Sequence, residues 1–142
     1  MPTRTGSAQW QGGGKGSGTV RVDGVLDAAY SAPSRFEEAE GTNPEELIGA
    51  AHAGCFTMFL ATVLAREGHE PTRLETDAHV TIERLEDQGP TITAIRLETE
   101  AAVDGIDEDA FQAAVAESKD NCPVSKALAG VPDISVEARL TG

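Results

Sequence analysis

The chain has 142 residues, which is the size of one domain, so we expect a single domain over residues 1–142. Its 11 Lys and Arg residues stand against 24 Asp and Glu, which gives a net charge of −13 at pH 7 with the histidines neutral. Binding to nucleic acid or to an anionic membrane depends on clustered Lys and Arg, so this charge argues against both partners.

The first residues, Met1 to Trp10, lack the apolar stretch of a signal peptide. The longest apolar candidate, around Phe56 to Leu64, is shorter than the ~18 residues that a membrane span needs. We therefore expect a cytoplasmic protein with no membrane partner. Two cysteines in such a chain are weak grounds for a structural disulfide.

The N-terminal third is typical of short strands and turns, with the glycine-rich stretch 11–18 (QGGGKGSG) between two of them. A phosphate-binding P-loop needs Ser or Thr directly after its Gly-Lys pair, whereas Gly16 follows Lys15 here. No G-x-G-x-x-G register fits either. The stretch therefore predicts a flexible hairpin connection.

A long helix is predicted to begin at Asn43, which is a good N-cap and is followed by Pro44 and two acidic residues at the positive end of the helix dipole. Glu46 has the position of a capping-box partner to Asn43. The helix should run to about residue 67, where Gly68 supplies a C-terminal stop.

The middle of this helix is dense in small residues and contains Gly49 and Gly54. Each glycine costs roughly 1 kcal/mol relative to Ala inside a helix. We expect close approach by another helix backbone to compensate, which predicts a central, buried helix.

Alternating apolar residues predict strands over residues 74–85 and 91–103, joined by a turn into an antiparallel hairpin. A second helix should begin near residue 107, a short helix at Pro123, and a last strand should cover residues 134–140. Strands, a long helix, two strands, two helices and a strand make an α+β protein.

The two cysteines differ in their local setting. Cys55 lies mid-helix among small residues, and free cysteine is among the most buried residue types, so packing alone accounts for it. Cys122 directly precedes Pro123 at a helix start, where free N–H groups and the dipole lower a thiol pKa from about 8.5. Capping alone is a fair alternative for Cys122. The pair could be two buried thiols, metal ligands or a redox pair.

A metal site is the weaker interpretation. His52 and Cys55 share a helical face, and Cys122, His69 or His79 could complete a shell, but the paired C-x₂₋₄-C spacing of zinc sites is absent. His52 is more typical of a packed, hydrogen-bonded histidine. No G-x-S-x-G motif is present, and the carboxylates are typical of solvated faces. We expect no metal and no other cofactor.

Two segments together resemble the OsmC/Ohr family, the osmotically inducible and organic hydroperoxide resistance proteins. The first comprises residues 34–37 (SRFE) and 41–56 (GTNPEELIGAAHAGCF), and the second comprises residues 121–128 (NCPVSKAL). The order of elements agrees from Ala8 to Leu140. Three features favour the OsmC branch over the Ohr branch, in which the first motif is typically NPEQL. They are the NPEEL motif, the HAGC motif and an arginine twenty residues before the first cysteine.

The resemblance implies an OsmC-like fold with antiparallel sheets around a long central helix, in an intertwined homodimer. It also implies an enzyme, a thiol peroxidase that reduces organic hydroperoxides. Cys55 would attack the peroxide and Cys122 would resolve the sulfenic acid as a disulfide, which a dithiol reductant of the lipoyl type would reduce. Arg35 matches the arginine that stabilises the thiolate, and Glu45 matches the glutamate that holds this arginine by a bidentate pair.

An apolar pocket comprising Phe36, Phe56 and Met58 would favour alkyl hydroperoxides over hydrogen peroxide, although core packing explains these side chains equally well. A non-catalytic thiol redox sensor or a small-ligand-binding protein on the same fold is the alternative function. A metal-binding or purely structural protein comes third.

Overall fold

The computed structural model describes residues 1–141 and divides into two compact units, Met1–Leu47 and Ile48–Gly142. The long helix α2 (Pro44–Arg66) begins in the first unit and continues into the second. The expectation that the chain forms a single domain stays a prediction.

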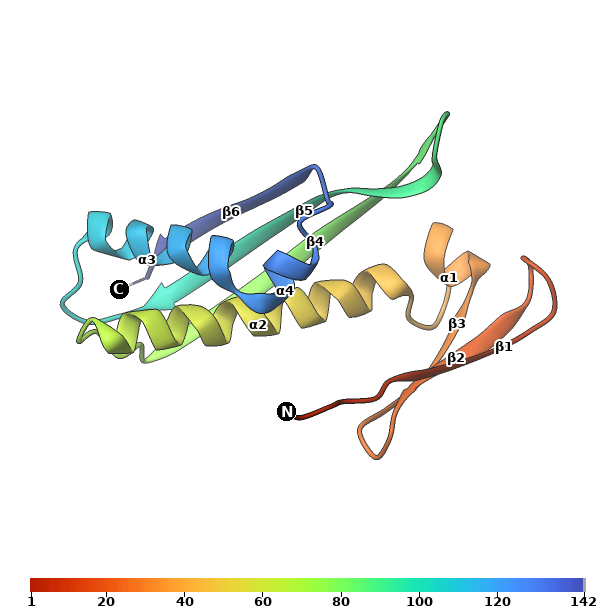
Figure 1. Ribbon diagram of the computed structural model, residues 1–142, viewed down its shortest axis with the longest axis horizontal. Coiled ribbons are helices and arrows are strands. Elements are labelled where there is room, and N and C mark those ends of the chain that lie inside the picture. The colour runs from red at the N-terminus through yellow and green to blue at the C-terminus, as the bar shows by residue number, and fades with distance from the viewer. Residues whose placement is uncertain (142) are drawn as a thin grey trace. The chain divides into compact units, whose positions relative to one another are not determined.

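The first unit is a three-stranded antiparallel sheet followed by a short helix (Figure 1). Its elements are β1 (Ser7–Gln11), β2 (Ser17–Val22), β3 (Leu26–Ser31) and α1 (Ala32–Phe36). The glycine-rich stretch connects β1 to β2 as a hairpin, as predicted, and Gly12 uses a φ of 90° that other residues rarely adopt. The sequence did not single out β3 or α1.

The second unit packs helices on one three-stranded sheet (Figure 1). Besides most of α2, it contains β4 (Arg73–Leu85), β5 (Gly89–Ala102), α3 (Glu108–Asn121), α4 (Pro123–Ala127) and β6 (Asp133–Leu140). The predicted β4–β5 hairpin is confirmed as antiparallel. However, β6 pairs with β5 in parallel, so the expectation of purely antiparallel sheets is wrong for this sheet. The chain enters β6 after crossing back through α3 and α4, and such a crossover permits a parallel neighbour.

The core of the second unit lies between its helices and its sheet. Ten fully buried residues form it: Phe56, Leu60, Val63, Leu64, Leu97, Ala101, Phe111, Ala114, Val115 and Cys122. They come from α2, β5, α3 and the junction before α4. The core is aliphatic apart from two phenylalanines, and it includes one of the two thiols.

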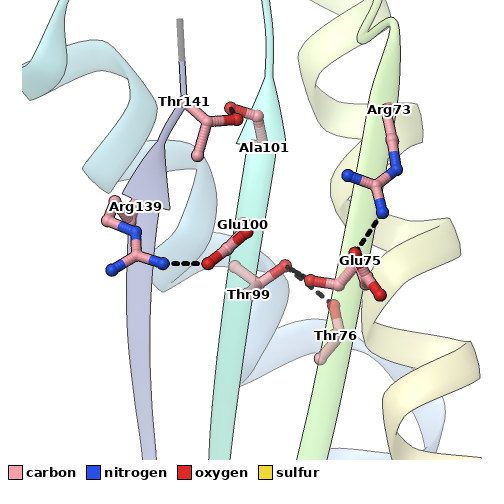
Figure 2. A network of polar contacts seen from close by, with 8 residues as sticks. All are labelled: Arg73, Glu75, Thr76, Thr99, Glu100, Ala101, Arg139 and Thr141. Carbon is pink, nitrogen blue, oxygen red and sulfur yellow. Dashed lines mark hydrogen bonds and ion pairs between the residues drawn. The ribbon is translucent and has the colours of Figure 1, made fainter.

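The opposite face of this sheet is charged and exposed (Figure 2). Arg73 pairs with Glu75 along β4, and Arg139 of β6 pairs with Glu100 of β5. On the buried side of β5, Thr99 donates to the Glu75 carbonyl at 3.0 Å, which ties the central strand to its neighbour. Alternation along the strands therefore separates a polar outer face from the core face.

Helix α2 differs from its prediction in what approaches its glycines. A Cβ built on Gly49 would lie 3.2 Å from the carbonyl oxygen of Ala78, so a strand packs closely there and not another helix. Among the residues that the structure describes, none comes within 4 Å of a Cβ built on Gly54. Within the single chain one side of this helix is open, because Ala51, Gly54 and Met58 are exposed.

Helix α2 also corrects the expectation that no apolar run reaches the length of a membrane span. An 18-residue window of this helix has a mean hydropathy of 1.8, so α2 is long and apolar enough to cross a membrane by length and composition alone. The core helix of a soluble protein meets the same criterion. Here the side that carries Phe56, Leu60 and Val63 is fully buried in the core of the second unit.

Candidate active site

The two cysteines lie together in the second unit. Cys55 is half-buried in the middle of α2, and Cys122 is fully buried at the junction of α3 and α4. Both are free thiols; Cys55 packs against the core cluster that contains Cys122, and each thiol shifts the pKa of the other. Two residues far apart in the sequence thus form one thiol pair.

Cys122 ends one helix and begins the next. Its N–H donates to the Ser118 carbonyl at 3.0 Å, which closes α3, and its Sγ accepts from the Ser125 N–H at 3.3 Å, which caps α4. Pro123 then takes the first helical position, where a missing N–H costs nothing. The expected placement of this thiol at a helix start is found.

The thiols differ in acidity. Burial alone would raise the pKa of Cys122, but hydrogen bonds from the Ser125 side chain and N–H, the Cys55 thiol and the Val124 N–H together lower it. Burial raises the pKa of Cys55, and the neighbouring Cys122 raises it further, against the Val124 N–H. Within this unit Cys122 is therefore the more acidic of the two thiols.

A buried histidine and serine extend the thiol pair. His52 lies one turn before Cys55 on α2, and its Nε2 is 2.7 Å from the Ser125 hydroxyl. That hydroxyl accepts from the Sγ of Cys122 at 3.3 Å. Sequence reasoning missed Ser125. Its signal was its position three residues after a cysteine that begins a helix, where capping contacts are common.

The arginine and glutamate lie together in the first unit. Arg35 donates from Nε to both carboxylate oxygens of Glu45, at 3.0 and 3.2 Å, and from Nη2 to Oε1 at 2.8 Å. The Glu45 side chain is only 7% exposed, so most of its hydrogen-bonding capacity is directed to the guanidinium. The guanidinium carbon of Arg35 also lies 5.3 Å from the ring centre of Phe36. The bidentate pair that the resemblance implied is present.

Local hydrogen bonds fix this ion pair at both ends. Ser31 caps α1 by accepting from the Ser34 N–H at 3.1 Å, and the Ser34 hydroxyl accepts from the Ser31 N–H at 2.8 Å. Asn43 donates from Nδ2 to the Ser34 carbonyl at 2.9 Å and accepts the Glu46 N–H at 2.8 Å. The short helix that carries Arg35 is thus tied to the start of the helix that carries Glu45.

Glu46 departs in part from its predicted role. Its N–H donates to Asn43 as a capping box requires, but its carboxylate accepts from the Thr42 hydroxyl at 3.0 Å. The side chain therefore braces the turn before α2, and it does not return to the Asn43 N–H.

Of the predicted pocket residues, Phe56 and Met58 have different surroundings. Phe56 is fully buried in the core, and Met58, two residues later on the same helix, is 73% exposed. Side chains two apart on a helix point about 200° apart, so these two face different surroundings. Phe36 is half-exposed in the first unit. Met58 instead lines a shallow groove between α2 and the start of β4, with Gly54 and Leu74.

Comparison with known proteins identifies the family. The model of the family described as OsmC-like protein matches residues 37–137. The chain belongs to the OsmC family. The match includes Glu45 and both cysteines and begins two residues after Arg35.

Relatives in this family align with the chain over most of its length. Peroxiredoxin OsmC of Escherichia coli (strain K12) is 46% identical over 128 residues, which cover 88% of this chain and 89% of that protein. The organic hydroperoxide resistance protein of Xanthomonas axonopodis pv. citri is 32% identical over 127 residues, 87% of each chain. The crystal structure of the organic hydroperoxide resistance protein OhrB of Bacillus subtilis is 30% identical with a TM-score of 0.71, and covers 96% of this chain and 98% of that one.

These similarities confirm two expectations for this OsmC-family chain. The α+β fold, with two three-stranded sheets and a long helix, is shared with solved members of the family. The higher identity to peroxiredoxin OsmC agrees with assignment to the OsmC branch.

Proposed function

We propose that this chain is a thiol peroxidase that reduces organic hydroperoxides to alcohols, with Cys55 as the attacking thiol and Cys122 as the resolving one. The observation that carries the proposal is the thiol pair, which joins the middle of α2 to the start of α4 inside one unit. The names of the relatives, a peroxiredoxin and organic hydroperoxide resistance proteins, support this reaction class.

The first step oxidises Cys55. Its thiolate attacks the outer oxygen of ROOH, the O–O bond breaks, and the alkoxide leaves with a proton as ROH. Cys55 becomes a sulfenic acid, the first reversible stage of cysteine oxidation. Cys55 is the half-buried member of the pair, whereas Cys122 is fully buried, so peroxide has the better access to Cys55.

Arg35 carries the positive charge that a Cys55 thiolate needs. Because burial and Cys122 raise the pKa of Cys55, the attacking thiolate needs a cation. A guanidinium held by the nearly buried Glu45 is rigid and permanently charged, and its remaining N–H groups are free to face a thiolate and the developing oxyanion. We assign that role to Arg35, with Glu45 as its positioning residue.

The second step closes the disulfide. The Cys122 thiolate attacks the Cys55 sulfur, the S–S bond forms, and the sulfenic oxygen leaves as water after taking a proton. Closure protects Cys55 from further oxidation. A dithiol reductant then returns both thiols and becomes a disulfide itself. We propose a lipoyl-type dithiol as this partner and the cytoplasm as the compartment.

A homodimer accounts for the uncovered side of α2. Ala51, Gly54 and Met58 are exposed on this helix and carry no charge. A second copy of the chain that covers them would bury apolar surface at about 25 cal/mol per Å². We propose that Arg35 serves Cys55 of the partner chain in this dimer.

Turnover tests the proposed function against the alternative of a thiol sensor or small-ligand binder. With dithiothreitol present, the wild-type protein should consume many equivalents of cumene hydroperoxide, and Cys55→Ser should consume none above background. A sensor would consume one equivalent per chain and stop. Equal consumption by the wild type and Cys55→Ser would refute the enzyme.

A further inference from the structure

The proposed peroxidase reaction does not use one buried polar network, which His52 and Ser125 form. His52 and Ser125 are both buried, and they connect to the Cys122 sulfur through contacts of 2.7 and 3.3 Å. Burying a polar side chain costs free energy unless it is hydrogen-bonded, so core positions are seldom given to histidine and serine for packing alone. The network ends at the thiol that closes the disulfide.

We propose that Ser125 and His52 form a proton relay that removes the proton of Cys122 during disulfide closure. The inference rests on the proposed function, because it gives Cys122 the resolving role. It assigns a task to two residues that the reaction as described above does not use.

The hydrogen-bond directions are set by counting donors. While the thiol is protonated, Cys122 donates its S–H to the Ser125 oxygen, so the single O–H of Ser125 is free to donate onward. Among residues 1–141 its one remaining hydrogen-bond partner is Nε2 of His52, at 2.7 Å, so Nε2 accepts and the proton of the neutral ring sits on Nδ1. Nδ1 has no hydrogen-bond partner among residues 1–141, so no carboxylate or carbonyl there holds the ring in another state.

The relay balances in protons and electrons. The Cys122 proton passes to Ser125 as the Ser125 proton passes to His52, which leaves a thiolate beside a hydroxyl and an imidazolium. The thiolate attacks the sulfur of Cys55, and the electron pair of the S–OH bond leaves with the oxygen. The imidazolium then returns its proton to that oxygen, so water forms and His52 is neutral again.

Burial suits His52 to this task. It lowers the pKa of His52, so the ring is neutral at rest and free to accept a proton. No charged side chain contributes to that shift in the described part of the chain. Hydrogen bonds through Ser125 connect His52 to one titratable group, the thiol of Cys122 beside α4, and that thiol in turn shifts the pKa of Cys55.

The test follows disulfide closure separately from peroxide attack. The reduced protein is mixed with one equivalent of cumene hydroperoxide, quenched with an alkylating agent at a series of times, and analysed by mass spectrometry for Cys55 sulfenic acid and for the disulfide. Ser125→Ala and His52→Gln should form the sulfenic acid at the wild-type rate and close the disulfide about a hundredfold more slowly.

The controls separate the relay from packing. Ser125→Thr keeps the hydroxyl and should restore most of the closure rate. Ser118→Ala removes another buried serine hydroxyl, which donates to the Ala114 carbonyl at 2.7 Å outside the network, and should close at the wild-type rate. In Ser125→Ala the closure rate should rise about tenfold per pH unit below the thiol pKa, because ionisation then occurs to solvent, while the wild type varies less.

Three results would overturn the relay: closure at the wild-type rate in Ser125→Ala, equal closure in Ser125→Ala and Ser125→Thr, or equally steep pH profiles in Ser125→Ala and the wild type. Failure of the proposed function gives a different outcome. In that case the wild type itself forms no Cys55 sulfenic acid, or it forms one that never becomes a disulfide with Cys122.

Discussion

At the scale of single residues, Glu45 acts through Arg35. Its carboxylate is nearly buried and accepts three hydrogen-bond contacts from the guanidinium. Hydrogen bonds to charged groups contribute about 1.5–3 kcal/mol, so Glu45→Gln should slow Cys55 oxidation by about 10- to 100-fold. The measurement is the second-order rate of sulfenic acid formation with cumene hydroperoxide.

The neighbouring acid is a matched control for that substitution. Glu46 is exposed and lies in the same first turn of α2, and its carboxylate accepts from the Thr42 hydroxyl, whereas that of Glu45 accepts from Arg35. Glu46→Gln should oxidise at the wild-type rate. If both variants slow Cys55 oxidation equally, the effect comes from charge at the start of the helix and not from the hydrogen bonds between Glu45 and Arg35.

The acidity of Cys122 predicts a second residue-scale result. In Cys55→Ser, the ultraviolet absorbance of the thiolate should show Cys122 titrating below the usual pKa of a cysteine. Ser125→Ala in that background should raise its pKa, because the thiolate then loses the hydroxyl that donates to it. A midpoint unmoved by Ser125→Ala would contradict the role of that contact.

The lowered pKa of Cys122 also makes the stability of the fold depend on pH. The pKa of Cys122 is lower in the folded protein than in the unfolded chain, so its ionised form stabilises the fold. This contribution is fully present above the unfolded pKa and is lost as the pH falls through the folded pKa.

Sequence reasoning at this scale found residues but not all of their neighbours. Cys55, Cys122, Arg35 and Glu45 follow from motifs, and the bidentate pair was predicted with its partners. Ser125 was missed because its contact to His52 joins α4 to α2, and no local pattern reports a pairing between elements so far apart in the chain. Phe56 was placed in a pocket because an apolar side chain has the same pattern in a core and in a cleft.

At the scale of elements, Asn43 joins α1 to α2. Asn43→Ala removes a helix cap worth about 0.5–2 kcal/mol and leaves the Ser34 carbonyl without its donor. Asn43→Ser keeps an acceptor for the Glu46 N–H, so urea unfolding should show it about 1 kcal/mol more stable than Asn43→Ala. Equal stabilities would mean that capping contributes nothing here.

The close contact at Gly49 predicts that a larger residue there lowers the stability of the fold, whereas helix propensity alone predicts that it raises the stability. Gly49→Leu would drive a side chain into the Ala78 carbonyl of β4 and should lower the free energy of unfolding by about 1–3 kcal/mol. Ala65→Leu, at an exposed position of the same helix, should stay within about 0.5 kcal/mol of the wild type. A stabilised Gly49→Leu protein would refute the tight packing of α2 on β4.

Element boundaries were predictable where capping chemistry is strong. The starts of α2, α3 and α4 follow from Asn43, Asp107 and Cys122, each of which accepts a backbone N–H. The direction of β6 was not predictable, because an alternating strand has the same pattern whether its neighbour runs parallel or antiparallel.

At the scale of the whole molecule, subunit mixing tests the proposed dimer. Arg35→Ala keeps Cys55, and Cys55→Ser keeps Arg35, so each variant alone should be inactive. Mixed after gentle dissociation, they should recover peroxide turnover, because one site of the mixed dimer combines Cys55 of one chain with Arg35 of the other. A mixture as inactive as its components would refute action on the partner chain.

The exposed face of α2 makes the dimer itself testable. Met58→Glu places a charge on this uncharged surface and should convert a dimer to a monomer in light scattering. Lys119→Glu, on α3, changes the charge by a larger amount elsewhere and should leave the mass unchanged. A wild-type protein that is already monomeric would contradict the dimer.

The central claim is that Cys55, and not the more acidic Cys122, takes oxygen from the peroxide. The most direct measurement is mass spectrometry after one equivalent of cumene hydroperoxide, with sulfenic acids trapped by dimedone in each single-cysteine variant. The account predicts a dimedone adduct on Cys55 in Cys122→Ser and none on Cys122 in Cys55→Ser. An adduct that forms on Cys122 at a rate equal to or above that of Cys55 would contradict it.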